Sequence, residues 1–133
     1  MLGLISPLIL AAMAANGSTC SGAAPGITAV TSSVVADTNT VNQYRLHVVV
    51  VNHGPMGQPS NDLQSVAIFQ NGDKVGEKGV PPLGSSKSYA FDFPFQRSDE
   101  AKMGTTHFTF RIVKDKNNAG DCTSSDNSYR LNV

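Results

Sequence analysis

Residues 65–80 read SVAIFQNGDKVGEKGV, and this stretch predicts a β-hairpin. Its centre, Asn71-Gly72, is the pair of residues that best tolerates positive φ, so it favours a two-residue turn between strands over 65–70 and 73–80. The first arm is apolar, whereas the second is short, charged and glycine-bearing, which is typical of an edge strand. The hairpin therefore predicts an antiparallel sheet with one exposed edge.

Residues 43–52, QYRLHVVVVN, give the strongest strand signal in the chain. Side chains alternate between the two faces of a strand. One face therefore carries four apolar side chains: Tyr44, Leu46, Val48 and Val50. On the other face, Arg45 and His47 lie in the N-terminal half of the strand, and Val49 and Val51 lie in its C-terminal half. We expect this strand to lie at the centre of a sheet.

Period-two alternation predicts four more strands, at residues 27–35, 87–95, 106–113 and 127–133. The strand over 87–95 is expected to end at Pro94, because proline cannot donate to a β-ladder. About seven short strands, with no helical pattern after Ala15, predict an all-β antiparallel β-sandwich. Its expected core is Tyr44, Leu46, Val48, Ile68, Phe91, Phe108, Phe110 and Leu131.

Composition restricts the class of partner. The 133 residues suit one domain. Ten basic and ten acidic side chains leave no net charge, so the basic surplus that nucleic-acid binding requires is absent. There is no tryptophan and the aromatic content is 7%, which leaves few platforms for stacking on sugars or bases. We expect no nucleic-acid partner.

The N-terminal run Leu2–Ala15, LGLISPLILAAMAA, is apolar and uncharged. It is shorter than the roughly 20 residues that span a bilayer, so no full-length transmembrane helix is expected. Its length and the small residues around Ala12-Met13-Ala14 suit a secretory signal, although the positive n-region is missing. Alternatively, the run is retained as an assembly helix; Ile5-Ser6-Pro7-Leu8-Ile9 is similar to the start of archaeal pilin-like subunits. The side chains that would then assemble are Leu4, Ile5, Leu8, Ile9 and Leu10.

Both interpretations of the leader stay open. The expected organisation is an apolar leader over residues 1–15, a linker over 16–26 and the sandwich over 27–133. The linker is expected because residues 18–25 are rich in Ser, Thr, Gly, Ala and Pro.

Three segments resemble the CARDB family, the cell-adhesion-related domain found in bacteria. They are residues 50–54 (VVNHG), residues 69–93 (FQNGDKVGEKGVPPLGSSKSYAFDF), and the closing stretches 115–119 (DKNNA) and 125–129 (SDNSY). The resemblance covers about residues 27–133 and implies an immunoglobulin-like, fibronectin-III-like sandwich that serves cell-surface adhesion or structural interaction. Cys122 and Ser125 stand where the family has acidic residues, so an acidic function of that loop is not implied.

Cys20 precedes the first strand and Cys122 precedes the last. In a sandwich the starting ends of these two strands lie together, so a disulfide between them is predicted. The apolar leader also indicates an oxidising compartment. The bond would close a loop of about 100 residues and add up to about 4.7 kcal/mol of stability in the chain-entropy model.

The loop over 115–127, DKNNAGDCTSSDN, offers oxygen ligands for calcium: Asp115, Asn117, Asn118, Asp121 and Asp126. It lacks acids at alternate positions with a distal Glu, so Asx-turns explain it better than a calcium site. The side-chain amides of Asn52 and Asn127 are expected to hold the loop backbone in place through hydrogen bonds.

No catalytic or cofactor motif emerges from the sequence. His47, His53 and His107 have no partner at metal-ligand spacing. The serines lack a nucleophile elbow, and the glycines at 72, 76 and 79 fall in a hairpin without a following helix. We therefore expect no cofactor and no enzyme activity.

The function expected is a non-enzymatic extracytoplasmic module, secreted or at the cell surface, that binds a protein partner or the cell surface and could self-associate. One alternative is a subunit of a pilus-like filament that polymerises through its apolar N-terminus. A second alternative is a carbohydrate-binding or inhibitory accessory domain of a secreted hydrolase system, although the lack of tryptophan argues against sugar binding.

Overall fold

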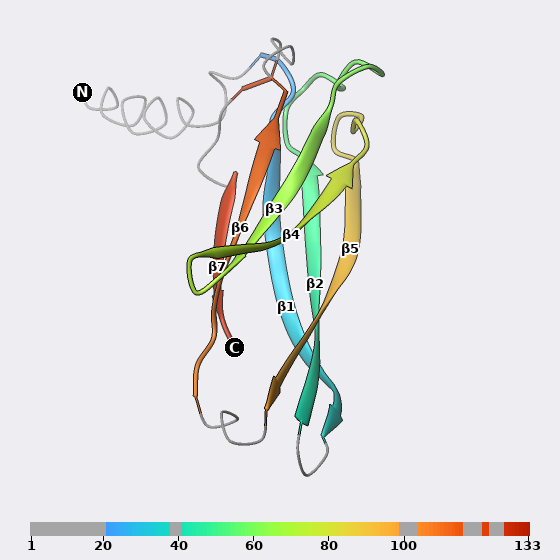
Figure 1. The fold of residues 1–133 in the computed structure, drawn as a ribbon. Helices are drawn as coiled ribbons and strands as arrows, with labels where there is room; N and C mark the ends of the chain where they lie inside the picture. The colour runs from blue at the N-terminus through green and yellow to red at the C-terminus, as the bar shows by residue number, and fades with distance from the viewer. Residues whose placement is uncertain (1–20, 38–40, 99–103, 116–120, 123–126) are drawn as a thin grey trace, which may run out of the picture.

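The computed structural model describes residues 21–37, 41–98, 104–115, 121–122 and 127–133. Within them the chain is all strand, without helix: β1 (Pro25–Asp37), β2 (Val41–Asn52), β3 (Gln64–Gln70), β4 (Asp73–Val80), β5 (Ser88–Ser98), β6 (His107–Lys114) and β7 (Ser128–Asn132). The strands form two antiparallel sheets, ordered β1-β2-β5 and β4-β3-β6-β7, that face each other (Figure 1). The immunoglobulin-like sandwich of seven strands is confirmed.

The hairpin forms as the sequence indicates. Asn71 and Gly72 have φ angles of 51° and 92°, and β3 and β4 pair on either side of them. β4 lies at the edge of its sheet with nearly all of its side chains exposed, and β2 is the central strand of the other sheet. The charge of β4 and the hydropathy of β2 therefore predict the places of these two strands.

The core lies between the two sheets. Six of the eight predicted core residues are buried: Leu46, Val48, Ile68, Phe91, Phe108 and Phe110. Tyr44 and Leu131 are partly buried and pack against this cluster. Phe95 also belongs to the core, because it is buried and meets Phe108 edge to face with ring centroids 4.9 Å apart.

The prediction that β5 ends at Pro94 is wrong, because the strand continues to Ser98. β5 is an edge strand, where a proline can stand without breaking a ladder between two strands. Pro94 pairs with Arg45, and the next residue, Phe95, is buried in the core. The apolar period therefore continues through the proline.

The sandwich begins earlier than residue 27. β1 starts at Pro25, and Ala23 and Ala24 are buried. Ala23 also forms a parallel bridge with Asp121. Residues 23–26 are therefore packed within the domain rather than part of a linker. In the described part of the chain no helix is long and apolar enough to span a membrane.

Candidate functional site

Asn52, the last residue of β2, connects the segments at one end of the sandwich through side-chain hydrogen bonds. Its side chain is fully buried, and its Oδ1 accepts hydrogen bonds from the backbone N–H groups of Ala24 (2.8 Å) and Gly54 (2.9 Å). Its Nδ2 donates to the carbonyl oxygens of Met56 and Leu83, both at 2.9 Å. The expected structural role of Asn52 is confirmed. For Asn127 the side-chain role stays a prediction.

Two buried carboxylates lie at the same end. Asp62 is 7% exposed and the side chain of Asp121 is 2% exposed. Asp121 Oδ2 accepts a hydrogen bond from Gln58 Nε2 at 2.7 Å and lies 3.9 Å from Lys114 Nζ. Asp62 Oδ2 and Asp121 Oδ1 have no hydrogen-bond partner. Burial and the charge of Asp121 raise the pKa of Asp62, and Lys114 partly opposes that rise.

Asp62→Asn is expected to raise the free energy of unfolding at pH 7 by about 1 kcal/mol, because it removes a buried negative charge that lies near Asp121 and has one oxygen, Oδ2, without a hydrogen-bond partner. Because the pKa of Asp62 is raised in the folded state above its ordinary value of 3.8, folding favours the protonated form. The contribution to stability is present below pH 3.8 and is lost as the pH rises through the folded pKa. Urea denaturation across acidic and neutral pH measures both effects.

The matched control for Asp62→Asn is Asp73→Asn, since Asp73 is exposed on β4. That variant should leave stability nearly unchanged. Two results would contradict the prediction: a lower free energy of unfolding in Asp62→Asn at pH 7, or a difference in stability between acidic and neutral pH that is the same as in the wild type. Either would show that neighbouring groups already balance the negative charge of Asp62.

The calcium interpretation of the 115–127 loop stays untested. Asp121 is engaged by Gln58 and Lys114, and the Asp115 N–H donates to the Leu63 carbonyl at 3.0 Å. Asn117, Asn118 and Asp126 lie outside the described residues. Among the residues that the structure describes, no three His, Cys, Asp or Glu side chains are grouped for a metal ion.

The start of the sandwich meets the segment around Cys122. The Cys122 N–H donates to the Ala23 carbonyl at 2.7 Å, three residues after the position of Cys20 in the sequence. Cys20 lies outside the described residues, as do the leader side chains Leu4, Ile5, Leu8, Ile9 and Leu10. The disulfide and the assembly role of the leader therefore stay predictions.

Peptide mapping of the native protein without reductant is expected to yield one peptide pair joined through Cys20 and Cys122. The backbone contact between Ala23 and Cys122 brings the chain segments within the reach of such a bond. The same digest after reduction is the control. Two free thiols in unreduced native material would contradict the prediction.

The outer face of the three-stranded sheet carries a second group of polar side chains. Asp92 on β5 contacts two residues of β2: its Oδ1 lies 2.7 Å from His47 Nδ1, and its Oδ2 lies 3.8 Å from Arg45 Nε. All three side chains are about half exposed. Across the sheet, Thr31 of β1 pairs with His47 and Ser33 pairs with Arg45. A row of polar side chains therefore crosses an exposed sheet face.

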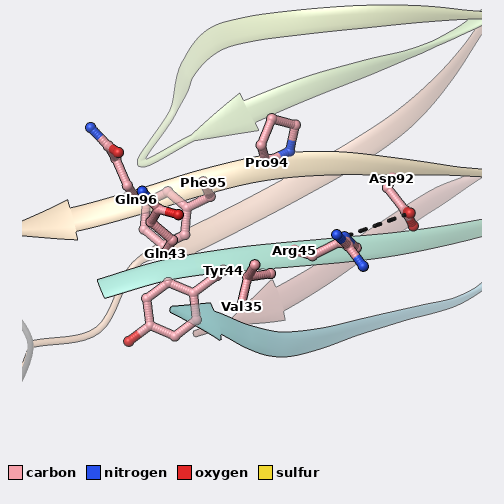
Figure 2. Close-up of a pocket in the computed structure, with 8 residues that line it drawn as sticks. All are labelled: Val35, Gln43, Tyr44, Arg45, Asp92, Pro94, Phe95 and Gln96. Carbon is pink, nitrogen blue, oxygen red and sulfur yellow. Dashed lines mark ion pairs between the residues drawn. The ribbon is translucent and has the colours of Figure 1, made fainter. Parts of the chain in front are cut away.

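An open pocket of about 500 Å³ lies beside this row (Figure 2). Eight residues of β1, β2 and β5 line it: Val35, Gln43, Tyr44, Arg45, Asp92, Pro94, Phe95 and Gln96. Apolar surface from Val35 and Pro94 is combined with the Gln43 and Gln96 amides and the Arg45–Asp92 ion pair. Such a mixed, exposed surface suits binding to another macromolecule better than enclosing a small substrate.

The sequence analysis did not identify this pocket, because its residues come from three strands whose register it could not fix. The signal available was Arg45 and His47 on the outward face of an otherwise apolar strand. The three histidines are not brought together: His47 lies on β2, His53 follows β2, and His107 begins β6 in the other sheet. His107 Nδ1 instead lies 2.7 Å from Asn132 Oδ1.

Solved structures with the same fold include CARDB domains. The CARDB domain of a Pyrococcus furiosus protein, crystallised in complex with di-metal ions, is 18% identical with a TM-score of 0.59; the match covers 85% of this chain and 93% of that one. A solution structure of that domain is 20% identical with a TM-score of 0.50, covering 82% and 93%. A domain from a Methanosarcina acetivorans protein provisionally named a cell surface protein is 22% identical with a TM-score of 0.53, covering 82% and 90%.

These similarities confirm the CARDB resemblance at the level of the fold. No protein-family model matches the chain. No curated protein matches it either.

Proposed function

We propose that this protein is a non-enzymatic, extracytoplasmic module that makes adhesive or structural contacts with a protein partner. The observation that carries the proposal is the exposed outer face of the β1-β2-β5 sheet, with its Arg45–Asp92–His47 network and adjoining pocket. The fold shared with a CARDB domain and with a domain of a protein provisionally named a cell surface protein supports the location.

The chemistry of this face suits a protein partner. Arginine is enriched at the energetic centres of protein interfaces. Arg45 Nε stands 3.8 Å from Asp92 Oδ2, beyond hydrogen-bond range, so the guanidinium is available to pair with a partner's acidic group. Pro94 and Val35 add apolar contact area beside it. The outer face therefore combines a charged anchor with an apolar surround.

Arg45→Ala is expected to weaken binding of the purified protein to cells of its source at least about tenfold, the effect of losing a hot-spot contact. The measurement is a binding isotherm with the fluorescently labelled full chain. The control is Lys78→Ala, which removes a cation from exposed β4 in the other sheet.

Protease treatment of the cells should abolish binding if the partner is a protein. Equal binding by the Arg45→Ala protein and the wild type would contradict the assigned face. Binding that survives protease treatment and is competed by surface polysaccharide would favour the carbohydrate-binding alternative instead.

A further inference from the structure

The buried carboxylates of Asp62 and Asp121 each keep one oxygen without a hydrogen bond. Asp62 is 7% exposed and the Asp121 side chain is 2% exposed, yet Asp62 Oδ2 and Asp121 Oδ1 accept no hydrogen bond from the described residues. Buried polar atoms without a partner are rare in folded proteins, and a bound water or ion is a common explanation. The two carboxylates lie close together, because the charge of Asp121 raises the pKa of Asp62. The two open oxygens therefore belong to one site, the acidic pair.

The Asp121 carboxylate is held through one oxygen, which leaves the other oxygen open. Its Oδ2 accepts a hydrogen bond from Gln58 Nε2 at 2.7 Å. Gln58 Oε1 in turn accepts from the Leu83 N–H at 2.9 Å and from Gln64 Nε2 at 2.8 Å, so the Gln58 amide is fixed at both of its ends. Hydrogen bonds of this kind hold metal-binding carboxylates in their binding orientation. Asp121 Oδ1 is thus oriented before any ligand binds.

Lys114 neutralises only one of the two negative charges of the acidic pair. Its Nζ donates a hydrogen bond to the Cys122 carbonyl at 3.1 Å and stays 3.9 Å from Asp121 Oδ2, beyond hydrogen-bond range. Its charge lowers the pKa of Asp62, but burial and the charge of Asp121 outweigh it. The acidic pair therefore keeps a net negative charge and two open oxygens.

We propose that Asp62 Oδ2 and Asp121 Oδ1 bind a calcium ion, with water completing its coordination. Oxygen ligands select a hard cation, and calcium accepts the irregular geometry of ligands from separate loops better than magnesium does. Asp62 lies in the loop between β2 and β3, so this site differs from a calcium loop confined to residues 115–127. No third His, Cys, Asp or Glu of the described residues joins the acidic pair, so the expected Kd is about 1 mM, as in weak extracellular modules.

The test titrates the calcium-free full chain with CaCl₂ at neutral pH and follows its backbone amide chemical shifts by NMR. We expect saturable shifts centred on residues 58–64 and 121–122, and none with NaCl at equal ionic strength. Asp62→Asn and Asp121→Asn should each weaken calcium binding at least about tenfold, because each removes a charged ligand. Asp73→Asn on exposed β4 is the matched control and should bind as the wild type does. The stability gain expected of Asp62→Asn belongs to the calcium-free protein.

Lys114→Gln should have the opposite effect and tighten calcium binding at least about threefold. It removes a cation that repels the ion, and it keeps a donor for the Cys122 carbonyl. No saturable shift up to about 20 mM calcium, equal binding by Asp62→Asn and the wild type, or weaker binding by Lys114→Gln would overturn the proposal. The first result would indicate that the two carboxylates share a proton instead. None of these outcomes depends on Arg45.

Discussion

Phe110→Ala is expected to lower the free energy of unfolding by about 3–5 kcal/mol, the usual range for removing a buried aromatic side chain. Phe110 is 0% exposed and lies in β6, between β3 and β7. Its cross-strand partners are Ile68 and Tyr129, and its ring stacks with that of Phe108 at a centroid distance of 6.1 Å. The surrounding strands are fixed by their hydrogen bonds, so they cannot close the cavity that the substitution leaves.

The control is Val113→Ala on the same strand. Val113 is 44% exposed, so its loss should change stability by less than about 1 kcal/mol. Chemical denaturation followed by far-UV circular dichroism measures both variants. A one-residue slip in register would exchange the two faces of β6. A small loss of stability in Phe110→Ala together with a large loss in Val113→Ala would therefore show that the opposite face of the strand lies in the core.

Most of the strands could be predicted from alternation because each of them has one face in the core, whereas β4, which is mostly exposed, was indicated by the Asn71-Gly72 turn. Phe108, Phe110 and Ile112 alternate with exposed His107, Arg111 and Val113, and all three apolar side chains are buried. The extension of β5 past Pro94 could not be predicted in this way. It depends on β5 lying at an edge, which is a property of the whole sheet.

The candidate sites are harder to predict, because they depend on register and on contacts between distant loops. β1 carries register shifts between Ile27 and Ala29 and between Val34 and Ala36, and these decide which side chains stand beside His47 and Arg45. Asp62 and Asp121 lie in loops that follow different strands, and Gln58 reaches Asp121 across 63 positions of sequence. Neither relation leaves a local pattern in the sequence.

Asn52→Ala is expected to lower the free energy of unfolding by about 3 kcal/mol or more. Its amide joins three segments: the start of β1 through Ala24, the loop after β2 through Gly54 and Met56, and the loop after β4 through Leu83. Alanine would leave the N–H groups of Ala24 and Gly54 and the Met56 carbonyl without these bonds, whereas the Leu83 carbonyl still accepts a hydrogen bond from the Gln58 N–H at 2.9 Å. Each unsatisfied buried group costs about 1–3 kcal/mol, with partial relief from water.

Asn61→Ala is the control for this position, because Asn61 is exposed in the loop between β2 and β3. Urea denaturation should show almost no change in that variant. An Asn52→Ala protein within about 1 kcal/mol of the wild type would mean that the three segments hold together through their backbone contacts alone.

Asn52→Asp separates the two halves of the network. The carboxylate keeps an oxygen for the N–H groups of Ala24 and Gly54, but it turns a second acceptor toward the Met56 and Leu83 carbonyls, which the Nδ2 group reaches at 2.9 Å. A buried charge facing two carbonyls destabilises the fold more than a missing amide does, so at pH 7 this variant should be at least as unstable as Asn52→Ala.

Protonation turns the second oxygen into a donor, and the folded state should therefore raise the pKa of the new carboxyl. Its stability relative to the wild type should consequently recover as the pH falls toward 4, whereas the deficit of Asn52→Ala should not change with pH. If the loss of stability in Asn52→Asp is also independent of pH, the hydrogen bonds that Nδ2 donates contribute little. The stabilising role of Asn52 then comes from the bonds that its Oδ1 accepts from Ala24 and Gly54.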